Sequence, residues 1–409
     1  MAKWFNKIFV LLVILYITQL INFLHSEVII DSILYGATII GFISMALYFI
    51  SPYKGISPVA YIIVVFAMLV PILSAWRSLV VFGQPMFFGI ARMRYMLILL
   101  MAFHLYYTDY SFKTLMRQIN AVNIFIAVSS IILFYIFGVD NMVAEKQFFT
   151  VYSADTEAAA DAIKGAKLTY CSQLIFVSVI YYMTSCMRKL NTKDAVMLGI
   201  LLFYTLFVHK GRQPLVAYAA VFVGYMATNL NARNIAISIA TVCAVGYLFI
   251  SDNSLTNRYT TILEGDYSTD TSALARFAEI EDVMPYIGKY PIGGFGCLSY
   301  HFNDGFFSVF NEYFYIEDIG IIGVIARGGL VLIFLCGLFY YLCLKYLFRV
   351  KDDDHRAFIR NFFIAAIVLT FTGSDILTCT PSFLIFFIYP MLYAPAKKRE
   401  VEKLFQFRL

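Results

Sequence analysis

Three basic residues fall within four positions between two apolar runs, at His209, Lys210 and Arg212. Gly211 gives this segment the backbone freedom of a tight turn, and Pro214 suits the first turn of a following helix. The start of that helix also carries the positive end of its dipole. Arginine binds phosphate well because its planar fork donates two parallel hydrogen bonds. The turn is therefore a candidate anion site, and the alternative is contact with lipid headgroups.

A second set of polar residues follows in a long hydrophilic segment. Arg276 lies in a stretch that looks helical, at 271–280. Glu279 follows within it, and Glu281 comes directly after it. The turn at 291–296 is rigid at its proline and flexible at its glycines. Because the segment from 251 to 318 is acidic overall, an anion site within it needs a few basic side chains that are directed inward.

Arg327 stands in an apolar run beside Gly328 and Gly329. A charge at the centre of a bilayer costs about 2.5–3.5 kcal/mol on insertion scales, so such residues face a cavity or a charged partner. Asp375, near the outer end of the next apolar run, is a candidate ion-pair partner. We weigh a functional role for Arg327 equally against a structural one.

Sequence motifs for metals, nucleotides and other cofactors are absent. The sequence contains no CxxC, GxxxxGK[ST], GxGxxG or HExxH pattern, and the seven cysteines suit small core positions. We therefore predict no metal and no cofactor. The net charge of +5 comes from scattered basic residues, so we expect no nucleic-acid partner.

The composition predicts that membrane-spanning helices position these residues. Hydrophobic residues make up 61% of the chain and charged residues 14%, and the mean hydropathy is +0.76. Such a composition excludes soluble, disordered and fibrous classes, because a soluble domain must cover itself with polar groups. An all-α polytopic membrane helical bundle is predicted. Its twelve expected spans, each an apolar run long enough to cross a bilayer, are 6–24, 28–50, 57–76, 94–108, 119–138, 168–187, 194–209, 213–229, 234–250, 319–346, 359–377 and 380–395.

The distribution of basic residues predicts the orientation of these spans. With both termini in the cytoplasm, most of the 31 Lys and Arg residues fall in short inner loops and in the tails, as the positive-inside rule requires. Two long loops, at 139–167 and 251–318, then lie outside. The short fourth span follows a segment, 78–93, that we expect to be re-entrant or interfacial, so ten or eleven spans remain alternatives.

The chain resembles the O-antigen polymerase and ligase family, that is, the Wzy-like and WaaL-like membrane glycosyltransferases. The likeness covers about 205–335 and rests on features in a fixed order: the basic turn 209–215, Arg276 before the turn 291–296, and 311–314 leading into 319–323. The resemblance implies a GT-C-like bundle in the bacterial inner membrane. Residues 1–250 would hold the first nine spans, 251–318 a periplasmic loop with short helices, and 319–409 the last three spans and a cytoplasmic tail.

The resemblance also implies the chemistry. The donor would be a glycan on undecaprenyl diphosphate, and a hydroxyl of the acceptor sugar would attack its anomeric carbon. We assign stabilisation of the departing diphosphate to Arg212 and Arg276, with Lys210 assisting, and expect His209 and Arg327 to contribute to substrate binding. The family histidine would fall at Phe310 here.

A general base must come within about 3 Å of the hydroxyl proton, or reach it through one water. Our first candidate for this base is His301, and Glu279 or Glu281 is the second. The predicted partners are the undecaprenyl-diphosphate-linked oligosaccharide and membrane lipid, with a chain-length regulator implied by family analogy alone.

Other activities fit the same sequence. We expect an O-antigen polymerase, which joins lipid-linked repeat units. An O-antigen ligase would share the donor but would transfer the glycan to lipid A–core. A transporter of lipid-linked oligosaccharide would instead show charges within several spans and internally similar halves. The bland alternative is a structural or receptor protein.

Overall fold

Every regular element that the structure describes is helical. The computed structural model of the chain describes residues 2–24, 26–50, 55–137, 171–189, 191–209, 212–228, 271–310, 314–350, 352–372 and 384–393. Within these ranges it contains helices and turns and no β-strand, which confirms the predicted all-α class for this part of the chain.

The helical elements are α-helices and short segments of tighter or wider helix that bend or extend the α-helices. The α-helices are α1 (Ala2–Ile17), α2 (Glu27–Ile50), α3 (Pro58–Val64), α4 (Val70–Phe82), α5 (Met86–Arg92), α6 (Met101–Tyr107), α7 (Phe112–Ile132), α10 (Ile175–Arg188), α11 (Thr192–Phe203), α12 (Arg212–Thr228), α15 (Thr271–Lys289), α16 (Phe306–Val309), α17 (Gly320–Tyr346), α18 (Asp353–Thr372) and α19 (Ile385–Ile388). The tighter or wider turns are η1 (Leu20–Leu24), η2 (Val65–Leu69), η3 (Arg94–Leu100), η4 (Leu133–Phe137), η5 (Ser172–Leu174), η6 (Tyr204–His209), η7 (Ile316–Ile319), η8 (Leu347–Arg349) and η10 (Tyr389–Leu392).

Five helical segments are long and apolar enough to cross a membrane, and each coincides with a predicted span. They are Val28–Ile50, Pro58–Phe82, Phe112–Ile136, Thr192–His209 and Ile316–Tyr346. The pair Met86–Arg92 and Arg94–Tyr107 adds a sixth only if it counts as one span bent by 54°. The described part of the chain therefore contains fewer such helices than the twelve predicted spans. The span predicted at 234–250 and the loop predicted at 139–167 lie outside the described residues.

One predicted span needs correction. The first span does not run unbroken from 6 to 24, because α1 ends at Ile17 and Gln19 has φ 60°. In the segment 78–93, expected to be re-entrant or interfacial, α4 continues to Phe82 and α5 then folds back against α4. Here α4 ends because Gly83 adopts a left-handed conformation, and Pro85 precedes the first turn of α5.

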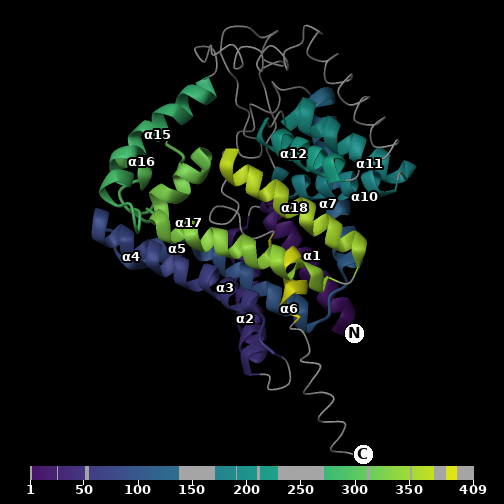
Figure 1. Cartoon of the computed structure of the whole chain (residues 1–409), viewed down its shortest axis with the longest axis horizontal. Coiled ribbons are helices and arrows are strands. Elements are labelled where there is room, and N and C mark those ends of the chain that lie inside the picture. The colour runs from purple at the N-terminus through teal and green to yellow at the C-terminus, as the bar shows by residue number, and fades with distance from the viewer. Residues whose placement is uncertain are drawn as a thin grey trace, which may run out of the picture.

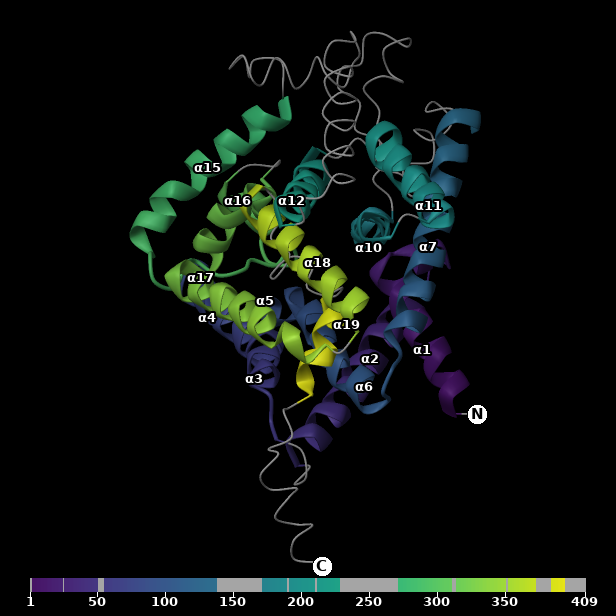
Figure 2. The ribbon, with the colours of Figure 1, turned by 45° about the vertical axis from the view of Figure 1, so that its right-hand side comes forward.

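Helix ends that were predicted to share the cytoplasmic side meet one another. The Tyr48 hydroxyl, at the end of α2, donates a hydrogen bond to the Leu392 carbonyl at 2.8 Å. The Tyr389 hydroxyl donates to the Tyr110 carbonyl, also at 2.8 Å. At another part of the molecule, α4 and α5 lie beside the first half of α17, with α15 and α16 next to it (Figure 1). Figure 2 shows α7, α10 and α11 on the far side of α18 from this group.

The helical stretch predicted at 271–280 is present and longer than expected. It is α15, which begins at Thr271, contains Pro285 and ends at Lys289. Its inner face packs on a separate apolar cluster that includes Val283, Phe295 and Phe314. The part of the predicted loop at 251–270 lies outside the described residues.

The turn at 291–296 inserts into α17 and breaks it. In an unbroken helix Leu330 and Val331 would donate to the carbonyls of Ala326 and Arg327. Instead the Leu330 N–H donates to Pro291 O at 2.9 Å and the Val331 N–H to Ile292 O at 3.2 Å. The two carbonyls released in α17 accept from the N–H groups of Phe295 and Gly296, each at 2.9 Å. The break thus leaves none of these four backbone groups unpaired, which a hydrocarbon environment requires.

The break depends on two glycines at the crossing point. Gly329 has φ 61° and ψ −160°, a region open essentially to glycine alone. A Cβ at Gly329 would stand 2.3 Å from the Ile292 carbonyl carbon, and one at Gly294 would stand 2.4 Å from the Arg327 carbonyl carbon. Any side chain at either position would push the turn out of α17.

We predict that Gly329→Ala destabilises the protein strongly. The forbidden backbone conformation and the clash with Ile292 should lower the free energy of unfolding by about 2–4 kcal/mol, seen as a lower apparent melting temperature in detergent. Gly337→Ala is the matched control, because a Cβ there meets nothing within 4 Å and alanine favours a helix by up to about 1 kcal/mol. Equal melting temperatures for the two variants would refute the role given to the break.

Candidate functional site

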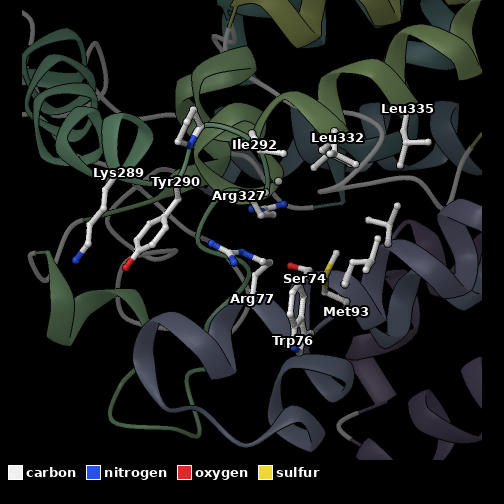
Figure 3. A pocket seen from close by; sticks show the side chains of 16 residues that line it. Ser74, Trp76, Arg77, Met93, Lys289, Tyr290, Ile292, Arg327, Leu332 and Leu335 are labelled. Carbon is white, nitrogen blue, oxygen red and sulfur yellow. The ribbon is translucent and has the colours of Figure 1, made fainter.

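A cavity of about 490 Å³ lies where α4, the end of α15, the turn after it and the break in α17 meet. Three basic residues line it: Arg77, Lys289 and Arg327. Figure 3 shows the guanidinium groups of Arg77 and Arg327 directed into the same space, with Lys289 and Tyr290 farther along. The three charges come from three different helices, so the cavity exists only in the folded bundle.

Arg77 is fixed by its contacts with the turn that breaks α17. Its Nε donates to the Gly294 carbonyl at 3.0 Å. Its guanidinium carbon lies 5.2 Å from the ring centre of Tyr290, and the Lys289 Nζ lies 5.3 Å from the same ring. Tyr290 therefore stands between two cations, an arrangement that holds both near the cavity through attraction to the ring face.

Arg327 is buried, with 2% of its surface exposed, and lies directly before the break. Its Nη2 donates to Glu317 Oε1 at 3.1 Å. The sequence analysis expected a cavity or a charged partner for Arg327; in the structure it lines the cavity and pairs with Glu317. Asp375, the partner proposed from sequence, lies outside the described residues.

A buried glutamine anchors the chain that follows the turn. Gln84, between α4 and α5, is fully buried and donates from Nε2 to the Cys297 carbonyl at 3.1 Å. Its Oε1 accepts from the Ser299 N–H at 2.7 Å. The guanidinium carbon of Arg92 lies 4.2 Å from the ring centre of Tyr300. These contacts fix the segment after residue 296 to α4 and α5, and they therefore stabilise the walls of the cavity.

The rest of the cavity is largely apolar. Its wall runs along α4 and the second half of α17 and includes Val70, Leu73, Trp76, Val331, Leu332 and Leu335. The buried Ser74 hydroxyl, which also lines the cavity, has no hydrogen-bond partner among the described residues. The second half of α17 also begins here, so its positive dipole end lies at the cationic part. Cations at one end and an apolar wall at the other suit an amphiphilic anion.

The basic turn predicted at 209–212 is described only in part. His209 ends η6, and its ring stacks with that of Tyr204 at a centroid distance of 5.9 Å. Arg212 is the first residue of α12, so Pro214 lies in the first turn of this helix, as predicted. The Arg212 side chain is not among those that the structure describes. Lys210 falls outside the described residues altogether. No geometry therefore joins this turn to the cavity.

The predicted residues of α15 and its following loop separate into buried and exposed ones. Glu279 is 4% exposed and accepts at Oε1 from the Tyr315 N–H at 3.1 Å. Arg276 lies one turn earlier and is half-buried, whereas Glu281 is exposed. The His301 side chain is exposed on a turn. Of the candidate bases, Glu279 alone is enclosed by the fold, because it lies on the inner face of α15.

Sequence reasoning missed Arg77 and Lys289. Both are basic residues on predicted outer segments, where the positive-inside rule disfavours them. That was the criterion that singled out the turn at 209–212, and it would have found them too. No local sequence pattern indicates that Arg77 on α4 and Lys289 on α15 line the same cavity. In the part of the chain that the structure describes, no cluster of three or more His, Cys, Asp or Glu side chains is arranged to hold a metal.

Comparison with known proteins gives no assignment. No protein-family model matches the chain, and no curated protein sequence matches it significantly. Function must therefore be argued from the cavity and its surroundings.

We predict that the cavity binds an isoprenoid diphosphate. Farnesyl diphosphate should raise the melting temperature of the protein in detergent, and farnesol or inorganic diphosphate should raise it less, because each offers only half of the contacts. Lys289→Met should weaken farnesyl diphosphate binding about tenfold, the loss of one charge-assisted contact.

Lys345→Met is the control for the loss of a cation. Lys345 lies near the other end of α17, with its Nζ 5.5 Å from the Tyr341 ring centre, so its removal should leave the affinity unchanged. The same stabilisation by farnesol as by farnesyl diphosphate would contradict the assignment of the basic residues to an anion.

Proposed function

We propose that this chain is an O-antigen polymerase, a membrane glycosyltransferase that joins oligosaccharide repeat units carried on undecaprenyl diphosphate. The observation that carries the proposal is the cavity that places Arg77, Lys289 and Arg327 at one end of an apolar wall. A lipid-linked diphosphate has the matching shape: two phosphates next to an isoprenoid chain. The family resemblance over about 205–335 supports the same donor.

The position of each part of the donor follows from the cavity. The diphosphate lies among the three cations. The first isoprenoid units lie along Leu332 and Leu335, and the tail continues into the bilayer. The glycan extends away from the apolar wall, towards α15.

Such a site accelerates transfer by stabilising the leaving group. As the acceptor oxygen bonds to the anomeric carbon, the carbon–oxygen bond to phosphate breaks and its electron pair stays on the lipid diphosphate. Fixed cations near that oxygen lower the barrier because the charge develops where they already stand. The family resemblance gives the same leaving-group role to Arg212, with Lys210 assisting, and to Arg276, but Arg276 lies on α15 and is not among the residues that line the cavity.

The distribution of the basic residues indicates which side of the membrane the proposed site faces. Both termini lie in the cytoplasm, and the cavity lies near the periplasmic face of the bacterial inner membrane. The contacts of Tyr48 and Tyr389 support this arrangement, because they bring predicted cytoplasmic ends together at a distance from the cavity elements. A chain-length regulator is the partner that family analogy adds.

A transporter of the same lipid-linked oligosaccharide is the second candidate. The broken helix α17 favours it, because interrupted helices with their dipole ends at a substrate recur in transporters. The proposed enzyme and this transporter would share the donor cavity. They differ in whether the glycan is lengthened.

We predict that the purified protein extends synthetic undecaprenyl-diphosphate-linked repeat units into a ladder of longer glycans. Arg327→Lys and Arg77→Ala should each slow the extension about 100-fold or more, because each removes a planar fork from the leaving-group site. Lys345→Met should match the unchanged protein. Product lengths on a gel provide the measurement.

The same assay separates the alternatives. Glycan transfer only when lipid A–core is supplied would identify the protein as a ligase and not a polymerase. Movement of the substrate across liposome membranes without lengthening of the glycan would identify it as a transporter. In the same assay Arg212→Ala and Arg276→Ala should impair extension, and full-length polymer from a variant that inserts normally would refute the role of that arginine.

A further inference from the structure

Two buried polar atoms on one turn of α15 lack hydrogen-bond partners among the described residues. They are Nε of Arg276, which is a donor, and Oε2 of Glu279, which is an acceptor. The two residues are three positions apart on a helix, so their side chains lie on the same face. The structure thus leaves a donor and an acceptor unused next to each other, where burial makes unpaired groups costly.

One chemical group satisfies both atoms. A hydroxyl donates one hydrogen bond and accepts others, so a single hydroxyl can donate to Glu279 and accept from Arg276. A phosphate cannot do this, because it would meet the Glu279 carboxylate with like charge. A sugar hydroxyl is therefore the ligand class that fits this turn.

The turn is linked to the donor cavity by one ion pair. Glu317 bonds Arg327, which lines the cavity, at 3.1 Å. The same short segment, η7, packs against α15 beside Glu279. Tyr315, just before η7, donates its backbone N–H to Glu279. Glu279 is thus connected to Arg327 of the cavity through Tyr315 and Glu317, although it lies on a different helix.

We infer that Arg276 and Glu279 form the acceptor subsite, in which Glu279 removes the proton from the attacking sugar hydroxyl. This inference rests on the proposed glycosyl transfer. The hydroxyl oxygen forms a bond to the anomeric carbon, the bond from that carbon to the phosphate oxygen breaks, and the proton passes to Glu279 Oε2. The diphosphate leaves with the electron pair among the cations of the cavity.

The charges around Glu279 suit it to this task. Burial is the largest reason that the pKa of the Glu279 carboxyl rises to about 7. Asp318 and Glu317, on η7, raise this pKa further. The Tyr315 N–H and the Arg276 guanidinium oppose the rise, and Arg327 on α17 pairs with Glu317. A base with a pKa near neutral both ionises and accepts a proton readily at physiological pH.

The inference is tested by Glu279→Gln in the extension assay. Glutamine can still accept the Tyr315 N–H through its carbonyl oxygen but cannot take a proton. The extension rate at saturating substrate should fall about 100-fold or more, while the affinity for farnesyl diphosphate stays within twofold of the unchanged protein. An unaltered melting temperature in detergent confirms that the variant is folded.

The dependence of the rate on pH identifies the base. A base works only when deprotonated, so the rate of the unchanged protein should rise with pH through about 7 and level off above it. Glu279→Gln should lose this rise. Asp304→Asn is the matched control, because Asp304 is an exposed carboxylate on the turn before α16, and it should keep both the rate and the rise.

Two results overturn the inference. One is a Glu279→Gln protein that retains the full rate or the pH-dependent rise. The other is His301→Ala abolishing the rise, which would return the role to the histidine. Failure of the unchanged protein to extend the repeat units at all would refute the proposed function, and this inference with it. That result is distinguishable from a result that concerns the Glu279→Gln variant alone.

Discussion

The interruption of α17 by the turn at 291–296 is the constraint on which the candidate site depends. Two hydrogen bonds of the helix are opened, and the turn pairs all four groups that they release. Such an exchange allows irregular backbone within an apolar helix, because no polar group of the backbone is left facing hydrocarbon. Gly294 and Gly329 make the close approach possible. The same turn follows α15 directly and so places Lys289, the last residue of α15, at the cavity.

This arrangement explains how several charges can stand together in an apolar bundle. Arg77 is held by the turn through Gly294, and Arg327 is held by Glu317. Each cation is therefore fixed before any ligand arrives, so an anion meets charges that need little reorganisation. The same packing encloses Glu279 on α15. The proposed leaving-group site and the inferred proton-accepting site thus depend on one structural feature, the docking of a turn into a broken helix.

The sequence predicted the class of this protein better than its site. Apolar runs located the five long spans, and α15 appeared where a helical stretch was expected, because such patterns are local. The roles of Arg77 and Lys289 depend on contacts between distant segments, which no local pattern records. Likewise, Glu279 and Glu281 look equivalent in the sequence, and only the packing of α15 shows that one is buried and the other exposed.

The most direct test of the central claim is to find where the isoprenoid chain lies. A benzophenone-tagged isoprenoid diphosphate would be photocrosslinked to the purified protein, and the labelled peptides would be identified by mass spectrometry. The account predicts labelling of α17 around Leu332 and Leu335 that excess untagged isoprenoid diphosphate suppresses. Label concentrated instead in the groove between α1 and α7, lined by Leu15 and Phe125, or label insensitive to competition, would contradict it.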